Sequence, residues 1–261
     1  MSFRFAPTFL ALSSLLVVSA GARIASAQGD GATDRPPAAS LPRSAGSGGL
    51  LAFTSGASVE GQRAIGSAFG GYDSTRKSGL FEAAAEARIW KGLSLRGGAL
   101  YSGSSDTLRP SFGARYQFLT EGGQGIDGSL GVFYRPEGLT EPEGEIETVL
   151  SAGSHLGQTY LLANLVYGQD PEANERDGEV RIAALHPVGS MVFLGLDGRV
   201  RFDLGSKATK LEAKLDAVAG PVATVLVGPV ALVAQGGVSA LRLKDSTSYG
   251  AVVLGGLGSS F

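Results

Sequence analysis

Strict two-residue alternation of charged and apolar side chains is the feature that most restricts the fold. At positions 81–90 (FEAAAEARIW), Glu82, Glu86 and Arg88 occupy alternate positions, and the positions between Glu82 and Arg88 on the other face are apolar. Positions 209–218 (TKLEAKLDAV) repeat this pattern. Ala, Glu, Lys and Leu favour helices, but on a helix these charges would spread around the cylinder. We therefore predict strands in both stretches, with one apolar and one polar face.

A period of two continues from Leu51 to the end of the chain and predicts an all-β fold. A strand between Leu51 and Gly70 would bring the total to about twelve. The length of that stretch, and Gly220-Pro221 inside another candidate, leave ten or fourteen strands open. The other candidates are Leu80–Trp90, Leu93–Gly103, Pro110–Leu119, Ile126–Arg135, Glu145–His155, Thr159–Gln169, Glu179–His186, Met191–Asp203, Lys210–Leu226, Val230–Leu241 and Tyr249–Phe261.

The connections between these strands are expected to alternate between short and long. The short ones are 91–92, 121–125, 156–158, 187–189 and 227–229, and the long ones are 70–79, 104–109, 136–144, 170–178, 204–209 and 242–248. Tight turns at one end and longer loops at the other are typical of transmembrane barrels. Strands in lipid must also satisfy their backbone groups among themselves, so the sheet must close. We predict a closed antiparallel transmembrane β-barrel with an even strand number and both termini in the periplasm.

Aromatic residues gather near the expected strand ends on the outward positions, as in the aromatic girdles of membrane barrels. At the loop end these are Phe81, Tyr101, Phe112, Tyr134, Tyr167, Phe202 and Tyr249, and at the turn end Tyr116, Phe118 and Phe261, with Trp90 beside its turn.

The final stretch, Tyr249–Phe261, carries an aromatic residue at each end of one face, with mostly small apolar residues between them. It resembles the terminal strand of Gram-negative outer-membrane β-barrels. The resemblance implies that Phe261 is part of the signal read by the outer-membrane assembly machinery.

The front of the chain has the features of an export signal. Arg4 precedes an apolar run, Thr8–Ala22, and small residues at 25–27 form a cleavage site near Ala27. We therefore expect residues 1–27 to be a signal peptide and the mature chain to reach the outer membrane of a Gram-negative bacterium. Residues 28–49 are rich in Gly, Ala, Ser and Pro, which predicts a flexible periplasmic linker or a thread into the lumen. Residues 50–261 would form the barrel.

Composition excludes several classes of protein. Without Arg4 and Arg23, both in the signal peptide, the 22 basic residues fall to 20 against 24 acidic ones, a net charge near −4. A nucleic-acid-binding protein is not expected from this balance. The absence of cysteine excludes a disulfide framework and a zinc–thiolate site. The expected partners are the lipid bilayer, the assembly machinery and small solutes.

Fifteen charged residues fall on the inward face of the predicted strands. As lumen-lining candidates they predict either a polar, water-filled path that selects solutes or a closed network of ion pairs. The first alternative is a small porin-like passive channel for polar or charged solutes, and the second a closed barrel that anchors or scaffolds partners. The candidates are Glu82, Glu86, Arg88, Arg96, Arg115, Asp127, Arg135, Glu147, Arg181, Asp197, Arg199, Arg201, Glu212, Lys214 and Asp216.

An enzyme is the alternative function from another class of protein. Outer-membrane phospholipases resemble this chain in strand number and place a Ser and a His on the outer wall. Only His155 and His186 are present, and neither lies in a motif with a serine and an orienting group. Two histidines far apart in sequence also make a weak metal site, and the Gly-rich stretches lack a phosphate-loop Lys. We expect no catalytic site, cofactor or metal.

Overall fold

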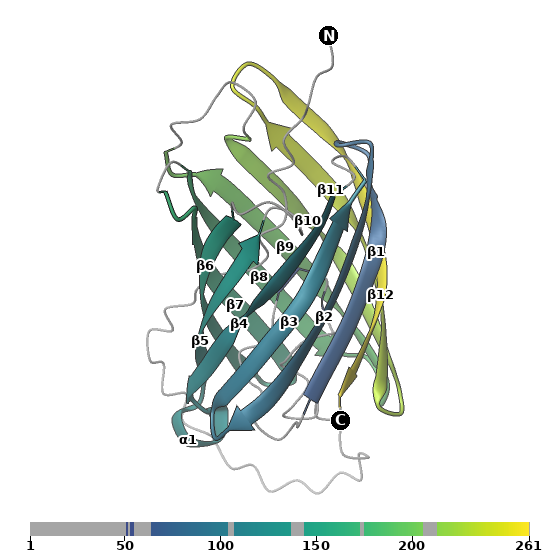
Figure 1. Cartoon of the computed structure of the whole chain (residues 1–261). Coiled ribbons are helices and arrows are strands. Elements are labelled where there is room, and N and C mark those ends of the chain that lie inside the picture. Colours follow the sequence, from purple (N-terminus) through teal and green to yellow (C-terminus); the bar gives the residue numbers. More distant parts are fainter. Residues whose placement is uncertain are drawn as a thin grey trace, which may run out of the picture.

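Antiparallel strands close into a twelve-stranded barrel in which each strand pairs with its neighbours in the chain and β1 pairs with β12 (Figure 1). The computed structural model describes residues 51, 53–54, 64–103, 107–136, 144–172, 175–205 and 213–260. The elements are β1 (Ala64–Asp73), β2 (Ser78–Trp90), β3 (Leu93–Ser102), β4 (Thr107–Leu119), α1 (Glu121–Gln124), β5 (Asp127–Pro136), β6 (Gly144–Leu156), β7 (Thr159–Gln169), β8 (Arg176–Pro187), β9 (Val192–Asp203), β10 (Leu215–Val227), β11 (Val230–Arg242) and β12 (Thr247–Ser260).

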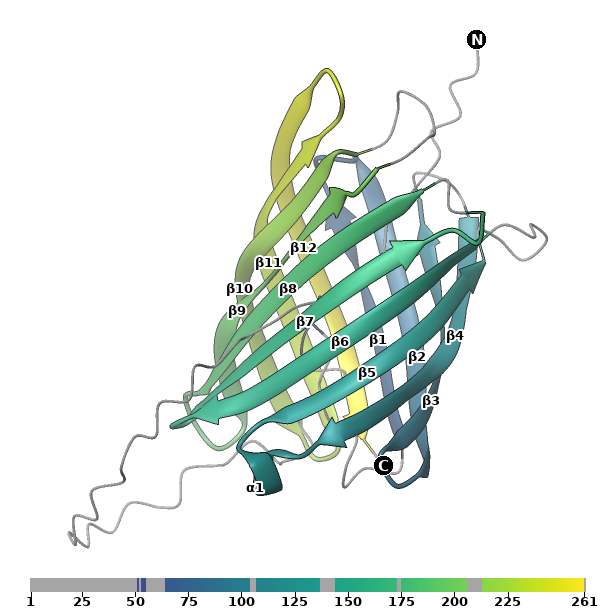
Figure 2. The same cartoon turned by 90° about the vertical axis from the view of Figure 1, so that its left-hand side faces the viewer.

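The β1–β12 ladder closes the wall. It runs without a register shift from Ile65 opposite Ser260 to Asp73 opposite Val252. All twelve strands therefore have a partner on both sides, and the wall has no open edge. The strands tilt strongly against the long axis of the barrel (Figure 2), as closure of a sheet requires. The predicted all-β closed barrel and the strand number of about twelve are confirmed.

Positions 81–90 lie in β2, as predicted. Of positions 209–218, the last four lie in β10, 213 and 214 precede it, and 209–212 lie outside the described residues. β1 ends at Asp73, three residues beyond the stretch in which we expected it, and β10 begins at Leu215 within the described residues. The Gly220-Pro221 pair does not end β10, because both residues pair with β9. Towards β11 the ladder skips these two positions, in agreement with the missing N–H of proline.

We call the end of the barrel that carries α1 the turn end, and the opposite end the loop end. The predicted strict alternation of short and long connections is wrong. Seven residues, 120–126, link β4 to β5 at the turn end, whereas only four, 74–77, link β1 to β2 at the loop end. The reason is that polar residues continue the ladder there, with Asp73 opposite Ser78.

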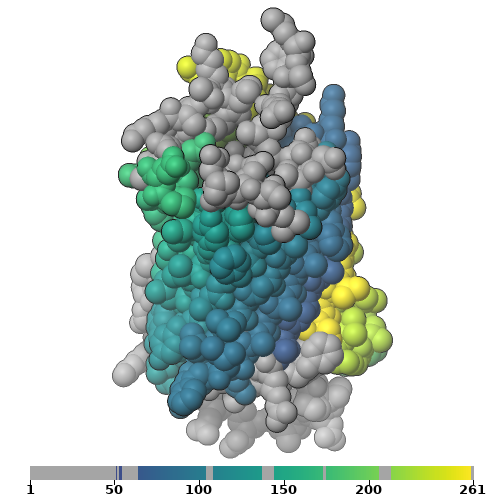
Figure 3. Space-filling view, in the orientation of Figure 1, coloured from purple at the N-terminus to yellow at the C-terminus, as the bar shows by residue number. Residues whose placement is uncertain are grey.

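Apolar and aromatic side chains cover the outside of the wall, part of which forms a continuous surface in Figure 3. The exposed aromatics include Tyr72, Phe81, Trp90, Tyr101, Phe112, Tyr116, Phe118, Tyr167 and Tyr249. Tyr134 and Phe202 are partly buried, with Tyr134 packed edge-on against Phe112; Phe261 lies outside the described residues. The described part of the chain contains no helix long and apolar enough to cross a membrane.

The interior is apolar at the turn end and mixed at the loop end. An apolar cluster fills the turn-end half, and a second one extends towards the loop end, where Val218 lies opposite Arg199 and Val252 opposite Asp73. Buried charges on β8, β9 and β10 share the loop-end half with the second cluster. The first cluster contains Leu51, Tyr160, Leu162, Ala183, Leu185, Phe193, Val222, Ala231 and Val233, and the second Phe53, Val218, Val252 and Leu254. Leu51 and Phe53 belong to no strand of the wall.

Candidate functional site: the charged interior of the barrel

Most of the lumen-lining candidates lie on the buried face of the wall. Glu82, Arg96 and Arg135 are partly buried, Arg88 and Lys214 are exposed, and Glu212 lies outside the described residues. Lys214 bonds to Asp203 at the loop end. The buried candidates are Glu86, Arg115, Asp127, Glu147, Arg181, Asp197, Arg199, Arg201 and Asp216.

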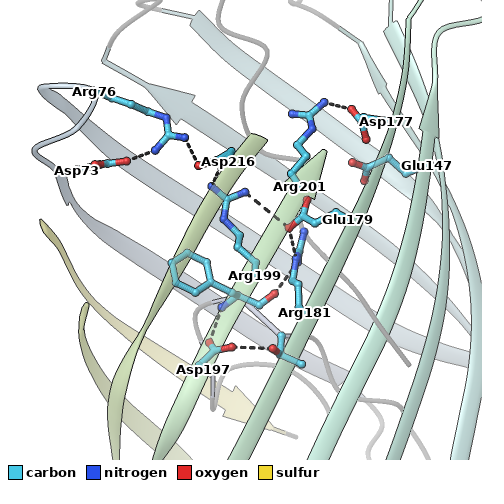
Figure 4. Close-up of polar contacts among 12 residues, drawn as sticks. Asp73, Arg76, Glu147, Asp177, Glu179, Arg181, Asp197, Arg199, Arg201 and Asp216 are labelled. Atoms are coloured by element: carbon cyan, nitrogen blue, oxygen red, sulfur yellow. Dashed lines mark hydrogen bonds and ion pairs between the residues drawn. The ribbon is translucent and has the colours of Figure 1, made fainter. Parts of the chain in front are cut away.

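The register of β8 against β9 brings the central charges together (Figure 4). Glu179 pairs with Arg201, and Arg181 lies directly opposite Arg199. Like charges in facing positions destabilise a sheet, so this register needs carboxylates close to both guanidinium groups.

Glu179 and Asp216 supply those carboxylates. Arg181 Nε donates to Glu179 Oε1 at 2.5 Å, and the same oxygen lies 3.7 Å from Arg199 Nη1. Arg199 Nη2 donates to Asp216 Oδ2 at 2.7 Å. Arg181 and Glu179 are fully buried. The central network is therefore a chain of opposite charges across three strands. Removal of one member would leave a buried charge without its partner.

A second set of ion pairs continues the network around the wall. Arg201 bonds to Asp177 and lies 3.9 Å from Glu145 Oε1. The guanidinium group of Arg135 forms a two-pronged contact with Glu147, at 2.9 Å for each nitrogen–oxygen pair. Bidentate contacts of this kind fix the geometry of both side chains.

The opposite wall, β2 to β4, holds separate ion pairs. Arg115 Nη2 lies 3.2 Å from Glu86 Oε2, and Ser94 Oγ donates to Glu86 Oε1 at 2.5 Å. Arg96 Nη2 lies 3.3 Å from Glu82 Oε1. Both signs of charge therefore line this side of the interior as well.

The turn between β1 and β2 reaches across the interior. From this turn, Arg76 forms ion pairs with Asp73 at the end of β1 and with Asp216 on β10. Two strands separate β1 from β10 in the sheet. Ser239 Oγ donates to Asp73 Oδ1 at 3.0 Å. Gly250 permits this approach, because a Cβ there would lie 2.5 Å from Ser74 Oγ and 2.7 Å from Thr75 N.

Asp197 lies between the turn-end apolar cluster and the buried arginines, opposite Ala183 of that cluster and two positions before Arg199. Its carboxylate accepts hydrogen bonds from Phe53 N at 2.9 Å and from Thr54 Oγ1 at 2.6 Å. Arg181 Nη1 donates to the carbonyl oxygen of Phe53 at 2.5 Å. Residues 53 and 54 therefore contact the charged face directly.

Asp127 has a different environment from the central charges. Its Oδ1 accepts from Gln117 Nε2 at 3.1 Å and from the first backbone N–H of α1, Glu121 N, at 2.9 Å. A carboxylate at this place satisfies an unpaired helix donor. Asp127 thus stabilises the connection at the turn end.

Both histidines lie at the turn end. His155 Nδ1 is 2.7 Å from Glu121 Oε2, and His186 Nδ1 is 3.0 Å from Thr159 Oγ1. Among the described residues, no group of three or more His, Asp and Glu side chains is arranged to hold a metal ion.

The sequence interpretation missed Asp73, Arg76, Asp177 and Glu179 as members of the network. Glu179 carried a usable signal, because it shares its face with Arg181 two positions later. Asp177 shares that face too, but it falls in the predicted loop 170–178, and Asp73 and Arg76 fall in the predicted loop 70–79. Nothing in the sequence indicated the contacts of Phe53 and Thr54.

Comparison with known proteins supports the fold. No family model and no curated protein matches the sequence. The NanC porin structure matches with a TM-score of 0.57 at 9% identity, over 75% of this chain and 100% of that one. KdgM porin gives 0.53 at 7% identity, over 76% and 99%. An outer membrane channel from Pseudomonas putida F1 gives 0.51 at 9% identity, over 78% and 97%. The chain thus has the fold of these small porins and channels.

Proposed function

We propose that this protein is an outer-membrane β-barrel acting as a small passive, porin-like channel for polar or charged solutes. One observation carries the proposal: the inner face of a closed twelve-stranded barrel holds fixed charges of both signs on opposite walls. Charged rings and patches inside a pore set which solutes pass. Membrane-spanning chains must satisfy their backbone groups internally, as this wall does. The shared fold with porins and channels supports the same function.

The proposal includes a topology. Residues 1–27 act as the export signal and residues 28–49 as a periplasmic linker, and Phe261 contributes to recognition by the assembly machinery; all of these lie outside the described residues. The first strand begins, and the last one ends, at the turn end. We assign this end to the periplasm, and we assign no enzymatic activity to the chain.

Conductance in planar bilayers tests the channel. We expect small, ohmic, weakly selective pores, because the interior is crowded and its charges are mixed in sign. Folding is verified first by gel migration, since a closed barrel without an edge resists detergent and migrates differently before and after boiling. Folded protein that never conducts would contradict the channel.

A closed anchoring barrel is the second candidate, and a specific observation favours it. Leu51 and Phe53 are buried inside the barrel, each in an apolar cluster. Side chains that fill a narrow barrel can leave no continuous path. Absence of conductance in the folded protein, including the variants described below, would support this candidate over the channel.

A further inference from the structure

The segment around Phe53 occupies the interior of the barrel although it is no part of the wall. Leu51, Phe53 and Thr54 are each 4–5% exposed. Leu51 packs in the turn-end cluster, and Phe53 packs beside Val218, Val252 and Leu254. These residues fill space that the wall alone encloses.

Three wall residues on β8 and β9, Arg181, Asp197 and Arg199, hold this segment, and we call them the segment clamp. Asp197 accepts from Phe53 N and Thr54 Oγ1, and Arg181 donates to Phe53 O. The guanidinium carbon of Arg199 lies 5.5 Å from the centroid of the Phe53 ring, within the range of a cation–π contact. The clamp thus contacts the main-chain N–H, the carbonyl and the aromatic ring of one residue.

The wall does not complete this site by itself. The Asp197 side chain is buried, and within the described part of the chain the hydrogen bonds to its carboxylate come from Phe53 and Thr54. A buried carboxylate without donors is strongly unfavourable. The clamp therefore requires a ligand that offers adjacent N–H and hydroxyl donors together with a carbonyl acceptor, which is the chemistry of a peptide with a hydroxyl side chain.

We propose that Arg181, Asp197 and Arg199 form a binding site for a peptide segment inside the lumen, whose resident ligand is the Phe53–Thr54 segment of the same chain, and that this segment restricts conductance. The proposal deepens the channel function and rests on it for the conductance, whereas occupation of the site is independent of transport.

Occupation is tested by thiol labelling, for which the absence of cysteine gives a clean background. The reporter is Leu51→Cys, because Leu51 is buried in the same segment but is not a partner of the clamp. In the folded full-length protein, Leu51→Cys is expected to react slowly with a polar maleimide, whereas Lys244→Cys, exposed in the β11–β12 turn, reacts at once. Adding Asp197→Asn to Leu51→Cys should raise the labelling rate roughly tenfold or more, because hydrogen bonds to a charged group are lost. Asp203→Asn is the matched control on β9, since Asp203 bonds to Lys214. Labelling of Leu51→Cys as fast as Lys244→Cys would overturn the site.

Phe53→Pro tests the same site without changing the wall. Proline lacks the N–H that Asp197 accepts, and the aromatic ring is lost as well. Conductance of Phe53→Pro should exceed that of the unaltered protein severalfold. A soluble peptide with the sequence of residues 50–56 should lower it again, whereas the same peptide carrying Phe53→Pro should not.

The outcomes separate the two proposals. Equal conductance of Phe53→Pro and the unaltered protein, when both conduct, overturns the restriction by the segment. Slow labelling that Asp197→Asn accelerates, in a folded protein that never conducts, upholds the peptide site and overturns the channel.

Discussion

Arg181 on β8 and Arg199 on β9 face one another across the ladder on the buried side of the wall. Glu179 relieves their repulsion, because one of its oxygens lies 2.5 Å from Arg181 Nε and 3.7 Å from Arg199 Nη1. Glu179 thus contacts both like charges, and together with Asp216, which bonds to Arg199, it compensates them in this register.

Glu179→Gln should destabilise the barrel by about 3–5 kcal/mol, because it leaves buried guanidinium groups without their shared carboxylate. The free energy of unfolding in urea, measured in lipid vesicles, checks this. Glu145→Gln is the matched control: Glu145 lies 3.9 Å from Arg201 and is more exposed, so the loss should stay below about 1 kcal/mol. Equal losses in the two variants would show that Glu179 does not neutralise the arginine pair.

Arg199→Gln together with Arg201→Gln should shift ion selectivity towards cations. Both arginines pair with carboxylates, Asp216 and Asp177, which stay in place after the substitutions. Reversal potentials across a salt gradient in planar bilayers measure the shift. Arg242→Gln, which removes an exposed charge near the end of β11, serves as control and should change selectivity less. Unchanged selectivity in the double variant would mean that the solute path does not pass these side chains.

The strands were predictable because alternation is a local property of the sequence. Glu82, Glu86 and Arg88 define a polar face within seven residues, and no distant contact is needed to identify it. The network was only partly predictable. That Glu179 shares a face with Arg181 follows from the sequence, but that it neutralises Arg199 depends on the register between β8 and β9.

Contacts across the interior could not be predicted from the sequence. Phe53 and Asp197 are 144 positions apart, and nothing in a two-residue period relates a residue outside the wall to one within it. Arg76 looked like a loop charge because its environment depends on barrel closure, which brings the β1–β2 turn over β10. Closure also determines which polar residues continue the pairing of two strands past their apolar part, as Asp73 and Ser78 do between β1 and β2.

Gly250→Val should displace the β1–β2 turn from β12. The added side chain would overlap Thr75 and Ser74, and overpacking of this kind costs about 1–3 kcal/mol. The amide of Ser74, which donates to Ala251 O at 2.9 Å, should then exchange its hydrogen faster with solvent. Gly255→Ala is the control, because its nearest neighbouring atom is 3.9 Å from the added Cβ. Unchanged exchange at Ser74 in Gly250→Val would contradict the packing of the turn against β12.

A charge placed on the outside of β9 should have an effect that depends on depth. Leu196 is 64% exposed near the middle of the strand, and Leu204, the residue after its loop end, is 50% exposed. In a bilayer the first position faces hydrocarbon and the second lies near the interface. Leu196→Arg should therefore lower the free energy of unfolding by about 2–4 kcal/mol, and Leu204→Arg by about 0–1 kcal/mol. Urea titrations in lipid vesicles compare the two substitutions. Equal losses would place the wall outside a membrane, since only hydrocarbon makes the energy of an exposed arginine depend on its depth.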